Sequence, residues 1–216
     1  MLLDSNLTGS GPLRQRGFVT TSRRDPSSHA AAGISVGAIA DAALAIIRTD
    51  GVAGLTMRAV AERLQVRAPS LYHHVHNKDE LLDLVARNAF DRFDADLTAY
   101  DGIRTVDDWI AVTTTGALEL RAFYADHPGL AALIQAKATP DRDRGQGSRA
   151  DLVRVQLKSL VDLGLPEPQA REIFLTSAHW TLAAVVAEPT TPDRFEDGLG
   201  LFMDGVRARL NALLAT

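Results

Sequence analysis

Cysteine is absent from this chain of 216 residues. Without thiols the chain has no disulfide, no thiol nucleophile, and no zinc or iron–sulfur site built on thiolates. An excess of positive charge is also missing, because 27 acidic side chains outnumber 23 basic ones and the isoelectric point is about 5.8. A protein that coats nucleic acid with its whole surface is more basic than this. Any contact with DNA is therefore confined to a small part of the chain.

Long hydrophobic runs are missing as well. The longest uncharged stretch in the C-terminal half covers residues 173–187 and includes Ser177, His179 and Thr181. It is shorter than the roughly 20 residues that cross a bilayer. The first residues, Met1-Leu2-Leu3-Asp4, lack the apolar core of a signal peptide. We therefore expect no contact with a membrane and a cytoplasmic location.

Charge is unevenly distributed along the chain. Residues 1–33 hold four arginines and two aspartates, whereas residues 91–216 hold 13 basic and 19 acidic side chains. The first segment is rich in Ser, Gly, Thr and Arg, contains Pro12 and Pro26, and has no apolar period. These features predict a flexible arm. The arm is either a leader without a role or an Arg-bearing segment that follows a DNA minor groove.

Apolar residues recur with a helical period from Ser35 onwards. Ser35, Thr56 and Asn77 are residue types that cap helix starts, Glu80 is placed to reach back to the third cap, and Gly51 is expected to end the first helix. No useful stretch has the two-residue period of a strand, so the sequence predicts an all-α fold. The expected helices cover residues 35–50, 56–64, 69–75, 77–97, 106–126, 128–136, 149–163, 168–188 and 193–214.

Residues 56–75 have the pattern of a helix-turn-helix. Two short helices are joined by Gln65-Val66-Arg67, a length typical of this motif. In such a pair the first helix braces the second, which enters the major groove of B-DNA. The small core expected to fix the angle between the two helices consists of Val60, Leu64, Val66, Leu71 and Val75.

The residues themselves carry a more specific signal. Residues 54–64 read Gly-Leu-Thr-Met-Arg-Ala-Val-Ala-Glu-Arg-Leu, and Pro-Ser-Leu-Tyr-His-His-Val and Asn-Lys-Asp-Glu-Leu-Leu follow at 69–75 and 77–82. Over residues 35–90 this sequence resembles the N-terminal DNA-binding domain of the TetR family of bacterial transcriptional repressors. A weaker resemblance over residues 106–214, to the tetracycline repressor branch, rests on His127-Pro128, Gln156-Leu157, Leu163-Gly164 and residues 179–182. The resemblance implies a helix-turn-helix domain at 34–80 and a helical ligand-binding and dimerisation domain at 81–216.

The resemblance also implies which residues meet DNA. Thr56 and Lys78 match side chains that contact phosphates at two helix starts, where backbone amides already favour an anion. Tyr72 and His74 match residues that contact the DNA backbone. Among the residues that face base edges, the arginines are the strongest candidates, because a guanidinium bonds guanine O6 and N7 together. The positions matched to base edges are Arg58, Arg67, Ala68, Pro69 and Ser70.

Several of these residues have plainer interpretations. Tyr72 can be a partly buried helix residue, Arg58 a solvated surface charge, and Lys78 a neighbour of a cap. The spacing of all of them together favours DNA contact. The chain departs from the tetracycline repressor at Arg67, Ala68 and His73, and this departure predicts a different operator.

Three histidines lie within four residues, at His73, His74 and His76. Such a cluster can hold a metal ion. On a helix, however, the adjacent His73 and His74 point about 100° apart, and the chain has neither cysteine nor an HExxH motif. We therefore expect no metal and no cofactor. We interpret His73 and His74 as DNA-facing donors whose affinity rises when they are protonated.

An apolar stripe runs along the last expected helix. Its members recur at steps of three and four residues, close to a heptad, and Gly198 and Gly205 lie beside them. The stripe is either the core of one chain or a seam between two copies, and the resemblance implies a homodimeric four-helix bundle. The residues predicted for this dimer interface are Phe195, Leu199, Phe202, Val206 and Leu210.

Large apolar and aromatic side chains in the C-terminal part are candidates for a ligand pocket, with core packing as the alternative for each. The tetracycline repressor branch binds magnesium through a histidine and a glutamate. Here Glu188 lies near the glutamate position, while Leu133-Ile134-Gln135 supplies no histidine, which argues against a magnesium–tetracycline ligand. The predicted pocket residues are Trp109, Phe123, Tyr124, His127, Leu130, Ile134, Phe174, His179 and Trp180.

These observations lead to three hypotheses. The first is a homodimeric repressor that binds a palindromic, double-stranded DNA operator and is released by a small, largely apolar effector, which swings the helix expected at 77–97. The second is an all-α enzyme that uses His127 and His179 for acid–base chemistry, although GxSxG, HExxH and nucleotide-binding signatures are absent. The third is a DNA-binding activator without a ligand. The resemblance favours the repressor.

Overall fold

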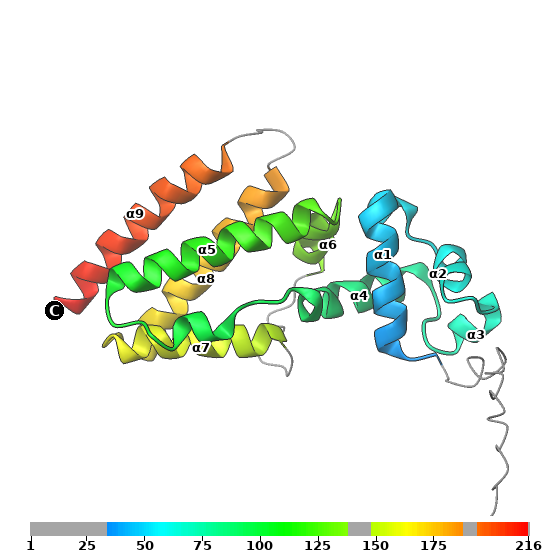
Figure 1. Ribbon diagram of the computed structural model, residues 1–216, viewed down its shortest axis with the longest axis horizontal. Helices are drawn as coiled ribbons and strands as arrows, with labels where there is room; N and C mark the ends of the chain where they lie inside the picture. Colours follow the sequence, from blue (N-terminus) through cyan, green and yellow to red (C-terminus); the bar gives the residue numbers. More distant parts are fainter. Residues whose placement is uncertain (1–33, 138–147, 188–193, 216) are drawn as a thin grey trace, which may run out of the picture. The chain divides into compact units, whose positions relative to one another are not determined.

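The computed structural model describes residues 34–137, 148–187 and 194–215, and every regular element within them is helical (Figure 1). The predicted all-α fold is confirmed. The arm predicted at residues 1–33 lies outside the described part of the chain. In chain order the elements are α1 (Val36–Gly54), α2 (Met57–Arg63), α3 (Ala68–Tyr72), α4 (Lys78–Asn88), the 3₁₀ turns η2 (Ala89–Arg92) and η3 (Leu97–Tyr100), α5 (Val106–Ala125), α6 (Leu130–Ala136), α7 (Ser148–Asp162), α8 (Glu167–Ala187) and α9 (Phe195–Leu214).

Three helix starts in the N-terminal part are capped as the sequence predicts. The hydroxyls of Ser35 and Thr56 each accept a hydrogen bond from the backbone N–H three residues on, at 3.1 Å in both cases. Asn77 Oδ1 accepts from the N–H of Glu80 at 2.9 Å, and the Glu80 carboxylate reaches back to the N–H of His76 instead of that of Asn77. Each cap satisfies an N–H that has no partner inside its helix. The starts of α1, α2 and α4 are therefore set locally.

A small core holds α2 and α3 together. Val60, Leu71 and Val75 are at most 1% exposed, and Leu64 and Val66 pack half-buried against the same cluster. The core predicted for the helix-turn-helix is therefore confirmed. The burial of these few side chains fixes the direction in which the exposed residues of α3 point.

The regular part of α1 ends at Gly51, as the sequence predicts. Gly51 has a backbone φ of 68° and is not helical, and one separate turn, included in the bounds of α1, follows as far as Gly54. The N–H of Val52, just after the break, donates to the carbonyl of Pro128 at 3.0 Å. The break at Gly51 is therefore the point where the end of α1 meets the segment before α6.

The helix expected at residues 77–97 is shorter than predicted, because α4 ends at Asn88. Asn88 Nδ2 donates to a carbonyl of its own helix at 2.7 Å, and the chain then turns through η2. Leaving the helical path buries Phe90 and Phe93 together, with ring centroids 5.3 Å apart. The Phe93 ring also meets Phe123 of α5, at 5.7 Å. Burial of both rings in the C-terminal part thus overrides the helical period that the sequence shows.

The C-terminal part is built from α5 to α9. α5 packs against α8 and α9, and α7 packs against α8 (Figure 1). A reciprocal capping box fixes the start of α5, because Thr105 and Asp108 exchange hydrogen bonds at 2.9 and 3.1 Å. Fully buried Trp109 and Leu160 anchor the interior. The expected helices at 106–126, 128–136 and 149–163 lie within about two residues of those found, a scatter usual for helix ends.

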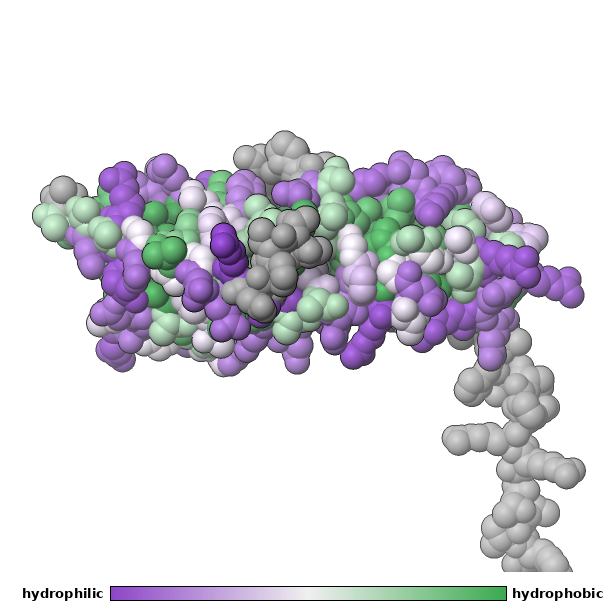
Figure 2. Space-filling model, turned by 90° about the horizontal axis from the view of Figure 1, so that it is seen from above, coloured by the Kyte–Doolittle hydropathy of each residue, from purple (hydrophilic) through white to green (hydrophobic). Residues whose placement is uncertain are grey.

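The surface of the described part is largely hydrophilic on the face shown in Figure 2, with hydrophobic side chains scattered between. No described helix is both long and apolar enough to cross a membrane. Residues 34–216 form one compact unit, and the predicted boundary between residues 80 and 81 falls inside α4. The division into two domains stays a prediction.

Candidate DNA-binding and effector sites

A group of polar side chains lies exposed around α3 and at the starts of α2 and α4. The turn between α2 and α3 is tight: Gln65 is left-handed with φ of 56°, and the N–H of Val66 donates to the carbonyl of Ala61 at 3.0 Å. Pro69 lies in the first turn of α3, where its missing N–H costs nothing. Of the ten predicted DNA-contact residues only Ala68 is half-buried; the exposed ones are Thr56, Arg58, Arg67, Pro69, Ser70, Tyr72, His73, His74 and Lys78.

The chemistry of these exposed side chains suits a phosphate backbone. Tyr72 is 47% exposed, which leaves its ring accessible to a partner and is also compatible with a partly buried helix residue. The Thr56 hydroxyl accepts from its own helix and keeps its proton to donate. Lys78 is the first residue of α4, where the helix N-terminus attracts anions. Two helix starts, those of α2 and α4, thus present one exposed donor each.

Arg58 forms an ion pair with Glu62, one turn along α2. The distance from Arg58 Nε to Glu62 Oε1 is 2.9 Å, and this hydrogen bond raises the pKa of Arg58 above its ordinary value. The two terminal nitrogens of the guanidinium make no hydrogen bond with another described residue. They are the pair of donors that a bidentate contact with guanine requires.

The three clustered histidines have different surroundings. His73 and His74 are exposed, whereas His76 Nδ1 lies 2.9 Å from Glu80 Oε2 on the adjoining turn of α4. Hydrogen bonding to His76 in turn lowers the pKa of Glu80. Among the described residues no three side chains of the metal-binding types converge on one point. His76 therefore supports the start of α4.

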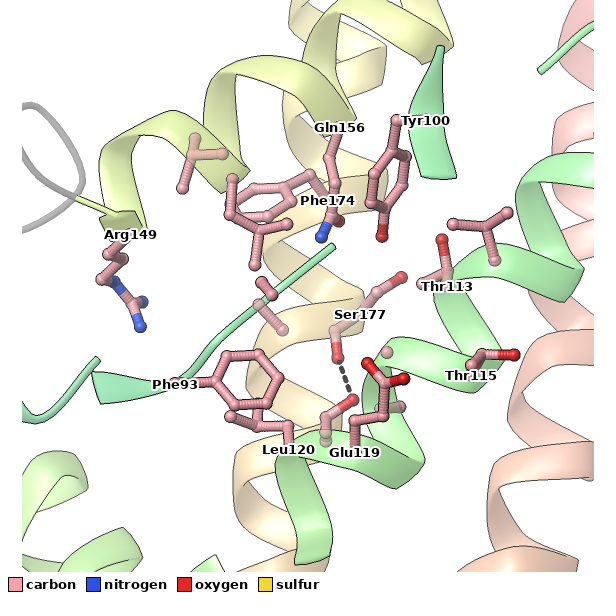
Figure 3. A pocket seen from close by; sticks show the side chains of 18 of the residues that line it. Phe93, Tyr100, Thr113, Thr115, Glu119, Leu120, Arg149, Gln156, Phe174 and Ser177 are labelled. Atoms are coloured by element: carbon pink, nitrogen blue, oxygen red, sulfur yellow. Dashed lines mark hydrogen bonds between the residues drawn. The ribbon is translucent and has the colours of Figure 1, made fainter. Parts of the chain in front are cut away.

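A cavity of about 420 Å³ lies between α5, α7 and α8 and is closed at one side by η2, η3 and the segment joining them (Figure 3). Its wall is mostly apolar and includes many small residues, such as Ala95, Ala99, Ala111, Gly116 and Ala178. A volume of this size is typical of sites that enclose small organic molecules. Of the nine predicted pocket residues, three line this cavity: Tyr124, Phe174 and His179.

The other six predicted pocket residues lie elsewhere, and this part of the prediction needs correction. Trp109 is fully buried near the start of α5, and Leu130 and Ile134 are buried in α6. Trp180 stacks on Phe202 of α9, with ring centroids 4.8 Å apart. The remaining two, Phe123 and His127, pack on each other with centroids 4.6 Å apart. Large rings fill space, so they mark the packed core, while the cavity opens where side chains are small.

Polar groups in the cavity are few. Burial raises the pKa of Tyr100 to about 12, so its hydroxyl stays protonated at neutral pH. Thr113 Oγ1 is buried nearby; the two hydroxyls interact without meeting the geometry of a full hydrogen bond, so both can bond to a ligand (Figure 3). Gln156 of α7 adds an amide to this side of the wall. The sequence prediction of the pocket did not include these three residues; a signal was available for Thr113 alone, in the helical spacing of small and polar positions on α5.

α6 joins the two candidate sites. At its start, Pro128 accepts a hydrogen bond from the N–H of Val52 in α1. At its end, Lys137 Nζ lies 2.6 Å from Asp79 and 2.9 Å from Asp83 of α4, and these carboxylates raise the pKa of Lys137. α6 also packs against α8, which lines the cavity. One short helix therefore contacts α1, α4 and α8.

The apolar stripe predicted to join two copies faces the interior of its own chain. Phe195, Leu199, Val206 and Leu210 are at most 7% exposed, and Phe202 is half-buried against Trp180. Side chains that are already buried lose no further surface to a partner, so the stripe is core. The outward face of α9 is different: it carries Leu201, which is 77% exposed, followed at steps of four, three and four by the exposed small residues Gly205, Ala208 and Ala212.

Comparisons with known proteins agree with this arrangement. The family model described as bacterial regulatory proteins, tetR family, matches residues 39–85. The class C tetracycline repressor protein of Escherichia coli is 32% identical over 185 residues, which cover 82% of this chain and 78% of that protein. An HTH-type transcriptional regulator of Saccharopolyspora erythraea is 40% identical over 99 residues, which cover 46% of this chain but only 39% of that protein.

Solved structures share the fold over most of the chain. A single-residue variant of TetR from Acinetobacter baumannii AYE, in complex with minocycline, superposes with a TM-score of 0.63 at 22% identity, over 85% of this chain and 99% of that chain. BioQ with its double-stranded DNA operator superposes with a TM-score of 0.61 at 26% identity, over 81% of this chain and 99% of that chain.

Proposed function

We propose, because this chain belongs to the tetR family of bacterial regulatory proteins, that it is a homodimeric repressor that binds a palindromic DNA operator and releases it on binding a small, largely apolar effector. The observation that carries the proposal is the connection of an exposed helix-turn-helix, through α6, to a helical part that encloses a cavity of about 420 Å³. The family is not enzymatic, so the hypothesis of an enzyme using His127 and His179 is wrong. We place the repressor in the cytoplasm, where it meets DNA.

Two kinds of contact would hold the operator. Thr56 and Lys78 at helix starts, together with Tyr72 and His74, would bind phosphates and set the register on the duplex. Arg58 and Arg67 would read base edges, with Ala68, Pro69 and Ser70 of α3 close against the groove. This chemistry needs only a small basic surface, in agreement with a chain whose net charge is −4.

The effector would occupy the cavity between α5, α7 and α8. The small residues of its wall leave room for a ring system, and Tyr100, Thr113 and Gln156 supply hydrogen bonds along one side. Relatives of this chain are named for tetracycline, and one similar structure holds minocycline. A magnesium–tetracycline complex fits this chain poorly, because Leu133 and Ile134 are buried core residues at the position of the metal-binding histidine. Glu188 lies outside the described residues.

The dimer would form through the outward faces of α8 and α9. On α9 this face carries Leu201 and the small residues beside it, which let a second helix approach closely. On α8, Thr176 and Ala183 are exposed seven residues apart, so they lie on one face of the helix. A two-fold axis through such a bundle presents two copies of α3 to two half-sites of DNA.

Effector binding would act on DNA through α6. Tyr124, near the end of α5, lines the cavity and lies four residues before Pro128. A shift there moves the Pro128–Val52 hydrogen bond at α1 and the Lys137 ion pairs with α4. Because α4 begins next to α3, such a shift changes the spacing of the two recognition helices in the dimer. This replaces the swing of one long helix at 77–97, since α4 ends at Asn88.

Selection of bound sequences from random duplex DNA tests the proposal. We expect a palindrome whose half-sites are separated by about one helical turn, or ~34–36 Å. Affinity for it should fall steeply with salt, because several phosphate contacts release counterions. Binding of a single chain to one unrepeated site would refute the dimer, and increased transcription from a promoter carrying the selected site would show an activator.

A further inference from the structure

Three of the hydroxyls that line the cavity are satisfied by their own helices. Ser177 and Thr181 of α8 each donate to the carbonyl four residues back at 2.9 Å, and Thr115 of α5 does the same at 3.1 Å. Thr113 of α5 differs from them. It is 8% exposed, and its buried Oγ1 makes no hydrogen bond with another described residue. A buried hydroxyl without a partner is costly, so the surroundings of Thr113 indicate what the cavity lacks.

The hydroxyl that faces Thr113 belongs to Tyr100, the last residue of η3 (Figure 3). Tyr100 is also 8% exposed and lines the cavity. Burial raises the pKa of Tyr100 to about 12, and the neighbouring Thr113 hydroxyl opposes this rise. Tyr100 is therefore a protonated donor in a desolvated place, next to a second hydroxyl that has no other partner among the described residues.

The number of protons in this pair decides what a ligand must bring. Two hydroxyls that face each other share at most one hydrogen bond, so one of their two protons is left without an acceptor. A ligand oxygen that accepts from Tyr100 leaves the Tyr100 oxygen to accept from Thr113, and both protons are then satisfied. A ligand that only donates, or that has no polar group, still leaves one proton without a partner. The pair therefore favours a ligand with an acceptor.

The wall beside Tyr100 leaves room for such a ligand. Gly116 lies three residues after Thr113 on α5 and lines the cavity, and a methyl group at this position would be 3.9 Å from Tyr100 Oη. A ligand atom in the space of the absent side chain thus comes close to the hydroxyl. Phe93 and Phe174, each at most 8% exposed, supply apolar faces for a ring-bearing body. A desolvated wall of this kind disfavours an anion, so the fitting acceptor is neutral.

We propose that the effector of this protein is a neutral, ring-bearing ketone or quinone whose carbonyl oxygen accepts a hydrogen bond from Tyr100. Thr113 is a positioning residue, because it acts through the Tyr100 oxygen. This inference deepens the proposed function and rests on it, since it assumes that the cavity is the effector site.

Three rigid tricyclic molecules of nearly the same shape test this selection: 9-fluorenone, which has a carbonyl acceptor, fluorene, which has no polar group, and carbazole, which has a donor only. Equilibrium dialysis against the full chain should give a Kd for 9-fluorenone about tenfold below those of fluorene and carbazole, as expected when one buried donor gains its acceptor. Tyr100→Phe should reduce this preference to about twofold or less and leave the Kd of fluorene within about threefold.

Thr181→Val is the matched control. It removes a buried hydroxyl from the same cavity, but one whose proton is already bonded to the Ser177 carbonyl, so the preference for 9-fluorenone should be unchanged. Circular dichroism shows whether each variant is folded. The comparison of the three probes on the wild-type chain does not depend on any variant.

The outcomes separate the two levels of the argument. If the three probes bind equally, or carbazole binds most tightly, the cavity accepts apolar molecules as the proposed function requires, but the inference is wrong. A preference for 9-fluorenone that persists in Tyr100→Phe also overturns it, because another group then selects the carbonyl. If none of the probes binds, the cavity is not an effector site, and the proposed function fails with the inference.

Discussion

Leu201 on α9 offers a direct test of how two copies of the chain would meet. Its side chain is 77% exposed, in a row of small residues on the outward face of the helix. An exposed leucine of this kind stabilises an interface only if a partner covers it. We expect Leu201→Ala to weaken the dimer and to leave the fold of each chain intact.

The size of the effect follows from the area that would be covered. Truncation removes three carbon groups, each contributing about 0.8 kcal/mol when buried. In a two-fold symmetric dimer the side chain is lost twice. If the partner covers between half and all of the exposed part of each Leu201 side chain, the free energy of dimerisation becomes less favourable by about 2–4 kcal/mol. Since about 1.4 kcal/mol is a tenfold change, the dissociation constant should rise about 30- to 1,000-fold. Sedimentation equilibrium over a range of protein concentrations measures this constant.

A matched control lies two residues away on the same helix. Leu199 is 1% exposed and packs inside its own chain, so Leu199→Ala should lower the free energy of unfolding by about 2–5 kcal/mol. Under conditions in which circular dichroism shows this variant to be folded, the dissociation constant of its dimer should equal that of the wild type. Unchanged self-association of the Leu201→Ala protein would refute the outward face as the interface, and dissociation of the Leu199→Ala dimer alone would assign the contact to the apolar stripe.

Further predictions concern DNA contact and acid stability. Arg58→Ala should reduce discrimination at one base pair of the operator by about 10- to 100-fold, measured by competition between operator variants. Lys78→Ala should weaken binding to all DNA sequences alike and reduce the slope of log affinity against log salt concentration by about one. A changed base preference would contradict this role. Hydrogen bonds from the N–H groups of Arg104 and Thr105 and from the Thr105 hydroxyl lower the pKa of Asp108, so its stabilising effect is present above about pH 4 and is lost as the pH falls further. Thermal unfolding should therefore show Asp108→Asn less stable than the wild type at pH 7, with a difference that shrinks below about pH 4.

Local chemistry explains what the sequence predicted well. Ser35, Thr56 and Asn77 each satisfy an N–H within three residues, so these helix starts depend on little beyond the segment itself. The helix-turn-helix core is equally local, because Val60 and Leu71 are separated by one tight turn. The exposed residues around α3 follow from that core, which is why nine of the ten predicted DNA-contact residues lie at the surface.

Tertiary contacts explain what the sequence did not predict. The end of α4 depends on where Phe90 and Phe93 are buried, and Phe93 meets Phe123, which comes from α5. The stripe on α9 has the spacing of a seam between copies, but the same spacing buries one side of a helix against its own chain. Six of the nine predicted pocket residues lie outside the cavity, because large rings were taken as its signal, whereas much of its wall consists of Ala99, Gly116 and other small residues.

The attachment of α6 to α1 has a consequence for how such regulators diversify. The contact between Val52 and Pro128 is a backbone hydrogen bond, so it places little demand on side chains at either position, and the left-handed Gly129 lets the two segments approach closely. The attachment to α4 depends on one lysine and two aspartates. None of these residues is among those proposed to read the operator or to line the cavity. In the proposed repressor, substitutions that change the operator or the effector can therefore leave these attachments of α6 in place.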